Sequence, residues 1–234
     1  MKTKDHFFKA VCTLAIPVAL QSMLQSSFSM VDQIMIGQLG EINVAGVGLA
    51  GKFASIYSVV ISAIGAVAGI MIAQYLGQKN RSEVRRSFFT NLLLGAGIAG
   101  MFMVICTLFP NQIMGAYTRD VQTRQAAAEY LMLISGTFVP MAGATLLSTL
   151  FRCLEKPRLP LYASILSALL NTSLNYIMIF GKLGISPMGV RGAAFATVIS
   201  QCANFLLMLL MLSKNGSLLK SNEGEPTVTL RMNW

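Results

Sequence analysis

The chain has 234 residues, of which 54% are hydrophobic and only 12% are charged, and its mean hydropathy is +0.63. About a quarter of the residues of a soluble globular domain are charged, so this composition excludes an ordinary water-soluble fold. The net charge of +9 would suit a nucleic-acid-binding protein if it formed one patch. The basic residues are instead spread between apolar runs, so we expect a membrane protein without a nucleic-acid partner.

Six apolar runs are each longer than the roughly 18 residues needed to cross a bilayer as a helix. They are Ala10–Val31, Phe53–Gln78, Ser87–Thr118, Tyr130–Phe151, Leu159–Gly181 and Gly192–Ser213. The third run is too long for one crossing, and its helix is predicted to stop near Pro110, where the ring removes a backbone donor. The strands of a β-barrel would be runs of about ten residues with alternating polarity, whereas these runs are continuously apolar and favour helices. The predicted fold is an all-α integral membrane bundle of six transmembrane helices.

The basic residues predict how this bundle is oriented. With the N-terminus inside, most of the 18 basic residues fall in inner segments, namely Lys2, Lys4, Lys9, Lys79, Arg81, Arg85, Arg86, Arg152, Lys156, Arg158, Lys214, Lys220 and Arg231. Only Arg119, Arg124, Lys182 and Arg191 fall in outer loops, and Lys52 lies at the edge of a span. The positive-inside rule therefore predicts that both termini are cytoplasmic, in a plasma membrane or bacterial inner membrane, with the basic clusters near anionic lipids.

The predicted domain organisation is one compact lobe followed by a tail. Residues 10–213 contain all six runs with short loops, whereas residues 214–234 are polar and resemble a cytoplasmic linker to a missing second lobe. None of the four cysteines is paired at metal-ligand or redox spacing, so we interpret them as packing residues. They are Cys12, Cys106, Cys153 and Cys202.

A weak internal repeat links the first and fifth runs. The segment from Asp32 to Gly40 is similar to the segment from Asn175 to Gly184. Such a repeat is typical of transporter folds, although chance could also produce it. Both helices would run from inside to outside, so the repeat predicts that Asp32 and Asn175 lie at the same depth and can face each other.

Asp32 is the single acid that the sequence places within a span. An ionised carboxylate in the bilayer costs at least about 2.5 kcal/mol, so such a residue normally faces a cavity and handles protons or ions. The alternative is that Asp32 lies near enough to the interface to be solvated.

Polar side chains recur at helical spacing along the same helix. The stripe consists of Ser22, Gln25, Ser26, Ser29 and Gln33, with Asp32 at its edge. It predicts a cavity-lining face, although hydrogen bonds across a helix contact remain an alternative. Pro17 frees a backbone carbonyl in this helix and is a candidate hinge.

The fifth and sixth helices carry candidate partners for Asp32. Asn171 and Asn175 lie one turn apart on one face, and their amide oxygens can coordinate sodium but cannot take up a proton. Thr197 could add a hydroxyl. The alternative is that the asparagines bridge helices.

Four stretches together resemble the MATE (multidrug and toxic compound extrusion) transporter family. They are Pro17–Gly40, Ala73–Asn80, Asn171–Gly181 and Gly192–Thr197, and the resemblance extends roughly over residues 10–212. The family has two six-helix lobes and exports organic cations and other amphipathic molecules in exchange for protons or sodium ions.

The resemblance implies that this chain corresponds to the N-terminal lobe. By the same resemblance, Asp32 is the ion-coupling carboxylate, and Asn171, Asn175 and Thr197 are cation-site positions. Some members have Asp where this chain has Asn175, which leaves one carboxylate here. The implied partners are small organic cations, membrane lipids and a C-terminal lobe, with no cofactor beyond the coupling ion.

Three alternatives compete with the drug exporter. A lipid-linked oligosaccharide flippase of the same superfamily would show a cavity rich in Arg and Lys, and these spans contain almost none of either residue. An intramembrane enzyme would require paired acids, a histidine cluster or a Ser–His or Ser–Lys pair within the spans, and the sequence has none. The third is a truncated, non-transporting membrane subunit.

Overall fold

The computed structural model describes residues 2–184 and 186–214, with side chains from residue 15 onward, and every regular element in this part of the chain is helical. The elements are α1 Lys2–Gly37, α2 Glu41–Gly77, α3 Arg81–Leu108, α4 Pro110–Gly115, α5 Val121–Ile134, the 3₁₀ turn η1 Ser135–Thr137, α6 Phe138–Cys153, α7 Arg158–Phe180 and α8 Gly189–Lys214. The prediction of an all-α bundle is confirmed. The predicted linker, apart from Lys214, lies outside the described residues.

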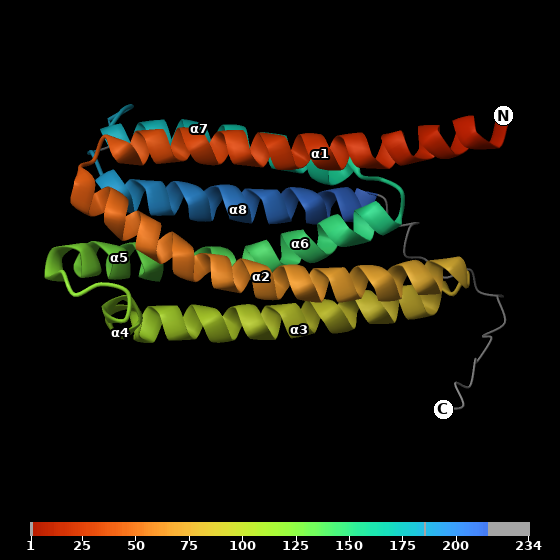
Figure 1. Ribbon diagram of the computed structural model, residues 1–234, viewed down its shortest axis with the longest axis horizontal. Helices are drawn as coiled ribbons and strands as arrows, with labels where there is room; N and C mark the ends of the chain where they lie inside the picture. Colours follow the sequence, from red (N-terminus) through yellow and green to blue (C-terminus); the bar gives the residue numbers. More distant parts are fainter. Residues whose placement is uncertain (1, 185, 215–234) are drawn as a thin grey trace.

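Five helical segments in the described part of the chain are long and apolar enough to cross a membrane: α2, α3, the continuous segment Val121–Cys153, α7 and α8. Helix α1 is 36 residues long but is not among them. The side chains of α1 are described only from residue 15 onward, so the apolar stretch that begins at Ala10 is only partly included. The sixth crossing therefore rests on the length of α1 and on its place beside α7 (Figure 1).

Helices α2 and α3 begin earlier than the apolar runs that predicted them. Helix α2 begins at Glu41, so Lys52, predicted to mark the edge of the span, lies inside the helix with an exposed side chain. Helix α3 begins at Arg81 and ends at Leu108, in agreement with the predicted stop near Pro110. Pro110 itself opens the short helix α4 at its first position. A charged residue marks where a helix leaves the hydrocarbon core of the membrane. The backbone hydrogen bonds of the helix can continue for several hydrated turns beyond that point.

The continuous helical segment Val121–Cys153, which corresponds to the fourth predicted helix, differs most from the prediction. It begins at Val121 rather than Tyr130, because Asp120 caps the helix by accepting a 2.8 Å hydrogen bond from the Thr123 N–H. Hydrogen bonds from Thr123 also hold the pKa of Asp120 below its usual value. The rod narrows to a 3₁₀ turn at residues 135–137, just before Pro140, which cannot donate to the preceding turn.

The rods lie roughly parallel, with α1 along α7 and α8 between this pair and α6 (Figure 1). The α2–α3 and α6–α7 connections and the end of α8 lie together at one end of the bundle. We call this the basic end, because it carries Lys79, Arg81, Arg152, Arg158 and Lys214. The opposite end holds the α1–α2 and α7–α8 connections.

A buried aromatic cluster joins α2, α3 and α6. The rings of Tyr57 and Phe138 stack with centroids 4.3 Å apart, and Phe102 lies 5.3 Å from Tyr57. The Tyr57 hydroxyl donates a 2.6 Å hydrogen bond to the Phe138 carbonyl, which satisfies its polar end. This cluster anchors the start of α6.

Helices α7 and α8 approach closely at Gly192. A Cβ at this position would lie 2.7 Å from the Met178 carbonyl oxygen on α7, so no larger residue fits without separating the helices. Where the chain leaves α7, Gly181 adopts the left-handed conformation with φ 69° and its N–H caps the Ile177 carbonyl. The two glycines position α8 against the site described below.

We expect Gly192→Ala to lower the free energy of unfolding in detergent by about 1–3 kcal/mol, and with it the melting temperature. The added methyl group meets backbone atoms of α7 rather than a movable side chain. Gly97→Ala is the matched control in α3, since a Cβ there meets nothing within 4 Å and alanine favours helix. Equal melting temperatures for the two variants would show that the α7–α8 contact is not tight.

Candidate functional site

Helices α1 and α7 run in parallel register. Gln21 on α1 donates a 2.8 Å hydrogen bond to Ser164 on α7, and Asn175 on α7 donates a 2.8 Å hydrogen bond to Asp32 on α1. Both pairs are separated by 143 residues. The prediction that Asp32 and Asn175 face each other at the same depth is therefore confirmed.

Asp32 is held in a network of side-chain amides. Its Oδ1 accepts from Asn175 Nδ2, and the same nitrogen lies 3.2 Å from Asn171 Oδ1 one turn earlier. Asn175 is 1% exposed, and its own Oδ1 is buried without a hydrogen-bond partner. A buried acceptor without a donor is unusual in a folded protein, and an amide oxygen in this position is suited to contact a bound cation.

The oxygen and nitrogen of the Asn171 side-chain amide can be exchanged without moving its neighbours, and the two assignments give different contacts with Asp32. In one orientation its oxygen lies 2.8 and 3.0 Å from the two carboxylate oxygens of Asp32. Acceptors this close require a proton or a cation between them. In the other orientation the Asn171 nitrogen donates to both carboxylate oxygens and its oxygen accepts from the Ser200 hydroxyl at 3.1 Å.

The network continues onto α8. In the first orientation Asn171 Nδ2 lies 3.1 Å from Ser200 Oγ and 3.5 Å from Thr197 Oγ1. Ser167 on α7 donates to the Ser200 carbonyl at 2.7 Å.

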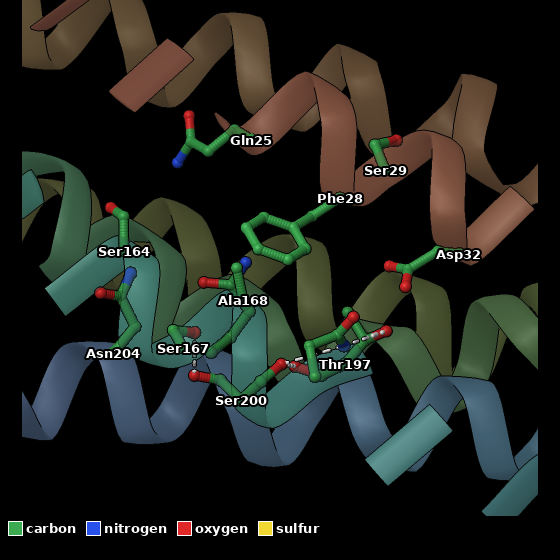
Figure 2. A pocket seen from close by; sticks show the side chains of 12 residues that line it. Gln25, Phe28, Ser29, Asp32, Ser164, Ser167, Ala168, Thr197, Ser200 and Asn204 are labelled. Atoms are coloured by element: carbon green, nitrogen blue, oxygen red, sulfur yellow. Dashed lines mark hydrogen bonds between the residues drawn. The ribbon is translucent and has the colours of Figure 1, made fainter. Parts of the chain in front are cut away.

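A cavity of about 250 Å³ opens beside Asp32 between α1, α7 and α8. Figure 2 shows the Asp32 carboxylate and the Phe28 ring reaching from α1 toward α7 and α8, across from Thr197 and Ser200. We call it the Asp32 cavity. Its lining is Gln25, Phe28, Ser29, Asp32, Ser164, Ser167, Ala168, Asn171, Thr197, Ser200, Gln201 and Asn204.

The polar stripe predicted on α1 only partly coincides with the face of α1 that points into the bundle. Gln25 and Ser29 line the Asp32 cavity as predicted, but Gln33 is exposed and is not part of its lining. Ser22 is also exposed and returns its hydroxyl to the Val18 carbonyl. The inward face of α1 passes through Gln21, Gln25, Phe28 and Asp32, because the groove between α7 and α8 selects that face. Pro17 lies buried in an uninterrupted α1, and its hinge role stays a prediction.

Several polar residues of the site were not predicted. Ser167 and Ser200 bridge α7 and α8, and buried Tyr130 on α5 lies close to Thr197. The serines could have been found by their spacing from Asn171 and Thr197. Tyr130 carries no sequence signal of its own, because it reaches the site only through the packing of α5 on α8.

Comparisons with known proteins identify the family. The MatE family profile matches residues 17–177. A Thermotoga maritima protein described as "Probable multidrug resistance protein NorM" is 31% identical over 201 residues, which cover 82% of this chain and 42% of that protein. "Probable multidrug resistance protein YoeA" of Bacillus subtilis is 26% identical over 91% of this chain and 46% of its own length.

The fold is also that of a solved transporter. "Outward-facing conformation of a multidrug resistance MATE family transporter of the MOP superfamily" describes a chain that superposes with a TM-score of 0.82 at 20% identity, over 94% of this chain and 49% of that one. This chain thus spans about half the length of the relatives it matches. Since the family profile matches more than half of the residues, the chain belongs to the MatE family, as the four sequence stretches predict.

Proposed function

We propose that this chain forms the N-terminal half of a secondary antiporter, which exports cationic or amphipathic small molecules in exchange for protons or sodium ions. The relatives named as multidrug resistance proteins support this class of function. Transport of this kind involves no chemical conversion of the substrate, and the only ion it requires is the coupling ion.

The observation that carries the proposal is the environment of Asp32. Its carboxylate lies between transmembrane helices, faces a cavity, and is surrounded by neutral amides rather than by a cationic partner. Its negative charge is therefore available to one cation at a time. A proton or sodium ion with oxygen ligands from Asp32 and Asn171 would neutralise it, and an organic cation would compete for the same charge.

Binding of tetraphenylphosphonium to the purified chain in neutral detergent tests this proposal. We expect binding at neutral pH in potassium buffer, and weaker binding as the pH falls or as sodium replaces potassium. Binding that responds to neither ion would contradict exchange through one site.

We further propose that the basic end faces the cytoplasm, with both termini on that side. Single cysteines replacing Glu41 or Pro187, in a background without native cysteines, should react with an impermeant maleimide added to intact cells. A cysteine replacing Lys79 should react only after permeabilisation, because it lies at the basic end. Labelling of position 79 in intact cells would reverse the orientation.

A further inference from the structure

Arg152 occupies an unexpected place. The sequence placed it in an inner segment directly after the fourth apolar run, and the structure shows it in the last turn of α6, where it lines a second cavity of about 300 Å³. We call this the Arg152 cavity. It is lined by Gln21, Gln25, Ser62, Met141, Ala144, Thr145, Ser148, Thr149, Arg152, Ser164, Gln201, Asn204 and Met208, and Arg152 is the single charged side chain among them.

Within the described residues, Arg152 has no acidic partner. The ion pairs found there join Arg86 to Glu83 and Arg191 to Glu129. Arg152 instead donates a 3.1 Å hydrogen bond from Nη2 to the neutral Gln21 Oε1. Gln21 is 5% exposed and is fixed by its own hydrogen bond to Ser164, so the contact directs the guanidinium into the cavity.

A cation in the last turn of a helix is favoured by the helix dipole, and a basic residue at this end fits the predicted orientation. Both effects explain the charge, but neither explains why the side chain turns toward a polar cavity. A guanidinium has five donors in a planar fork, and one hydrogen bond to an amide leaves most of them available.

Two further polar groups in the same cavity lack partners. Ser148 Oγ and Asn204 Oδ1 are buried and make no hydrogen bond, and these residues are 7% and 8% exposed. Ser148 lies one turn before Arg152 on the same face of α6. A hydroxyl and an amide that can turn its nitrogen outward would complete the shell of an oxyanion held by Arg152.

We propose that the Arg152 cavity is a second charged subsite, which binds the carboxylate of an amphipathic substrate through the Arg152 guanidinium. This inference rests on the proposed function. Gln21 and Asp32 are eleven residues apart on α1, or about 16 Å, so the two charges form separate subsites. The two cavities are neighbours, because both are lined by Gln25, Ser164, Gln201 and Asn204.

Rhodamine B and its ethyl ester differ only in the free carboxylate and provide a matched pair of probes. Fluorescence polarisation with the purified chain should show the acid binding about tenfold more tightly than the ester, the factor given by about 1.4 kcal/mol from one charge-assisted contact. Arg152→Gln should remove this acid preference and leave ester binding unchanged, while Arg152→Lys should retain part of it. Arg158→Gln removes the same charge at the basic end outside the cavity lining and should change neither affinity.

The acid preference should also be unaffected by sodium, because the carboxylate does not compete for Asp32. Equal binding of acid and ester by the unmodified chain, or equal loss of both in Arg152→Gln, would overturn the proposal. Loss of the Arg152-dependent preference on adding phosphatidylglycerol would assign the oxyanion site to a lipid phosphate instead. A separate measurement tests the antiporter proposal. If Asp32→Asn does not alter the affinity for the ester, that proposal fails whatever the result for Arg152.

Discussion

Asp32→Asn is expected to abolish ion-coupled export while leaving the fold intact. The substitution keeps the shape of the side chain and an oxygen that accepts from Asn175, so the contact between α1 and α7 is preserved. It removes the one negative charge that the Asp32 cavity offers to a proton, a sodium ion or an organic cation. Gradient-driven efflux should fall to the level of empty vesicles.

The measurement is ethidium efflux from vesicles under an imposed proton or sodium gradient. Because this chain covers 42% of the Thermotoga maritima relative, the vesicles should contain it together with the portion of that protein it does not cover. Asp120→Asn is the matched control, since it neutralises an acid at the exposed N-cap of α5 and asparagine is an equally good cap. Efflux that survives in Asp32→Asn at equal protein levels would mean that Asp32 is merely solvated at the interface.

The sequence predicted the helical rods where hydrophobicity alone determines them. Helix α7 was expected at residues 159–181 and spans Arg158–Phe180, and α8 was expected at 192–213 and spans Gly189–Lys214. For both, charges or glycines lie directly at the ends. The start of α2 was misplaced because Lys52 can remain helical while its long side chain reaches solvent. A single charge interrupts a hydropathy run but not a backbone hydrogen-bond ladder.

The part of the site that was predicted correctly is the pair Asp32 and Asn175, where the helical periodicity and the internal repeat of the sequence agree. The matching depth of Asp32 and Asn175 follows from two parallel helices, and their hydrogen bond needs nothing else. The face of α1 that turns inward was shifted by one position, since a broad polar surface permits several rotations and only the groove between α7 and α8 selects one. The place of Arg152 in a cavity was not predicted, because the sequence does not show the direction of a side chain in the last turn of a helix.

Position 175 should determine how strongly the site prefers sodium. Asn175→Asp places a second carboxylate in hydrogen-bonding range of Asp32, and two carboxylates at such a distance repel unless a cation or proton lies between them. We expect the sodium concentration needed to compete with tetraphenylphosphonium to fall by at least about tenfold. One additional negative charge 4 Å from the sodium ion contributes on the order of 4 kcal/mol of attraction at an effective dielectric constant of about 20, and desolvation offsets part of this energy. Asn175→Ala removes one amide and no charge, and water can replace it, so sodium affinity should fall by less than about tenfold.

The sodium concentration that halves tetraphenylphosphonium binding, measured at fixed pH for the unmodified chain and both variants, provides the comparison. Gln33→Glu is the control for a general effect of negative charge, because it adds a carboxylate beside Asp32 in the sequence but on an exposed side chain outside the Asp32 cavity. If Gln33→Glu strengthens sodium competition as much as Asn175→Asp does, the cation responds to the summed potential of α1 and not to a site between α1 and α7. A large gain confined to Asn175→Asp would instead place the coupling ion at the Asp32–Asn175 contact, where the parallel register of the two helices brings its ligands together.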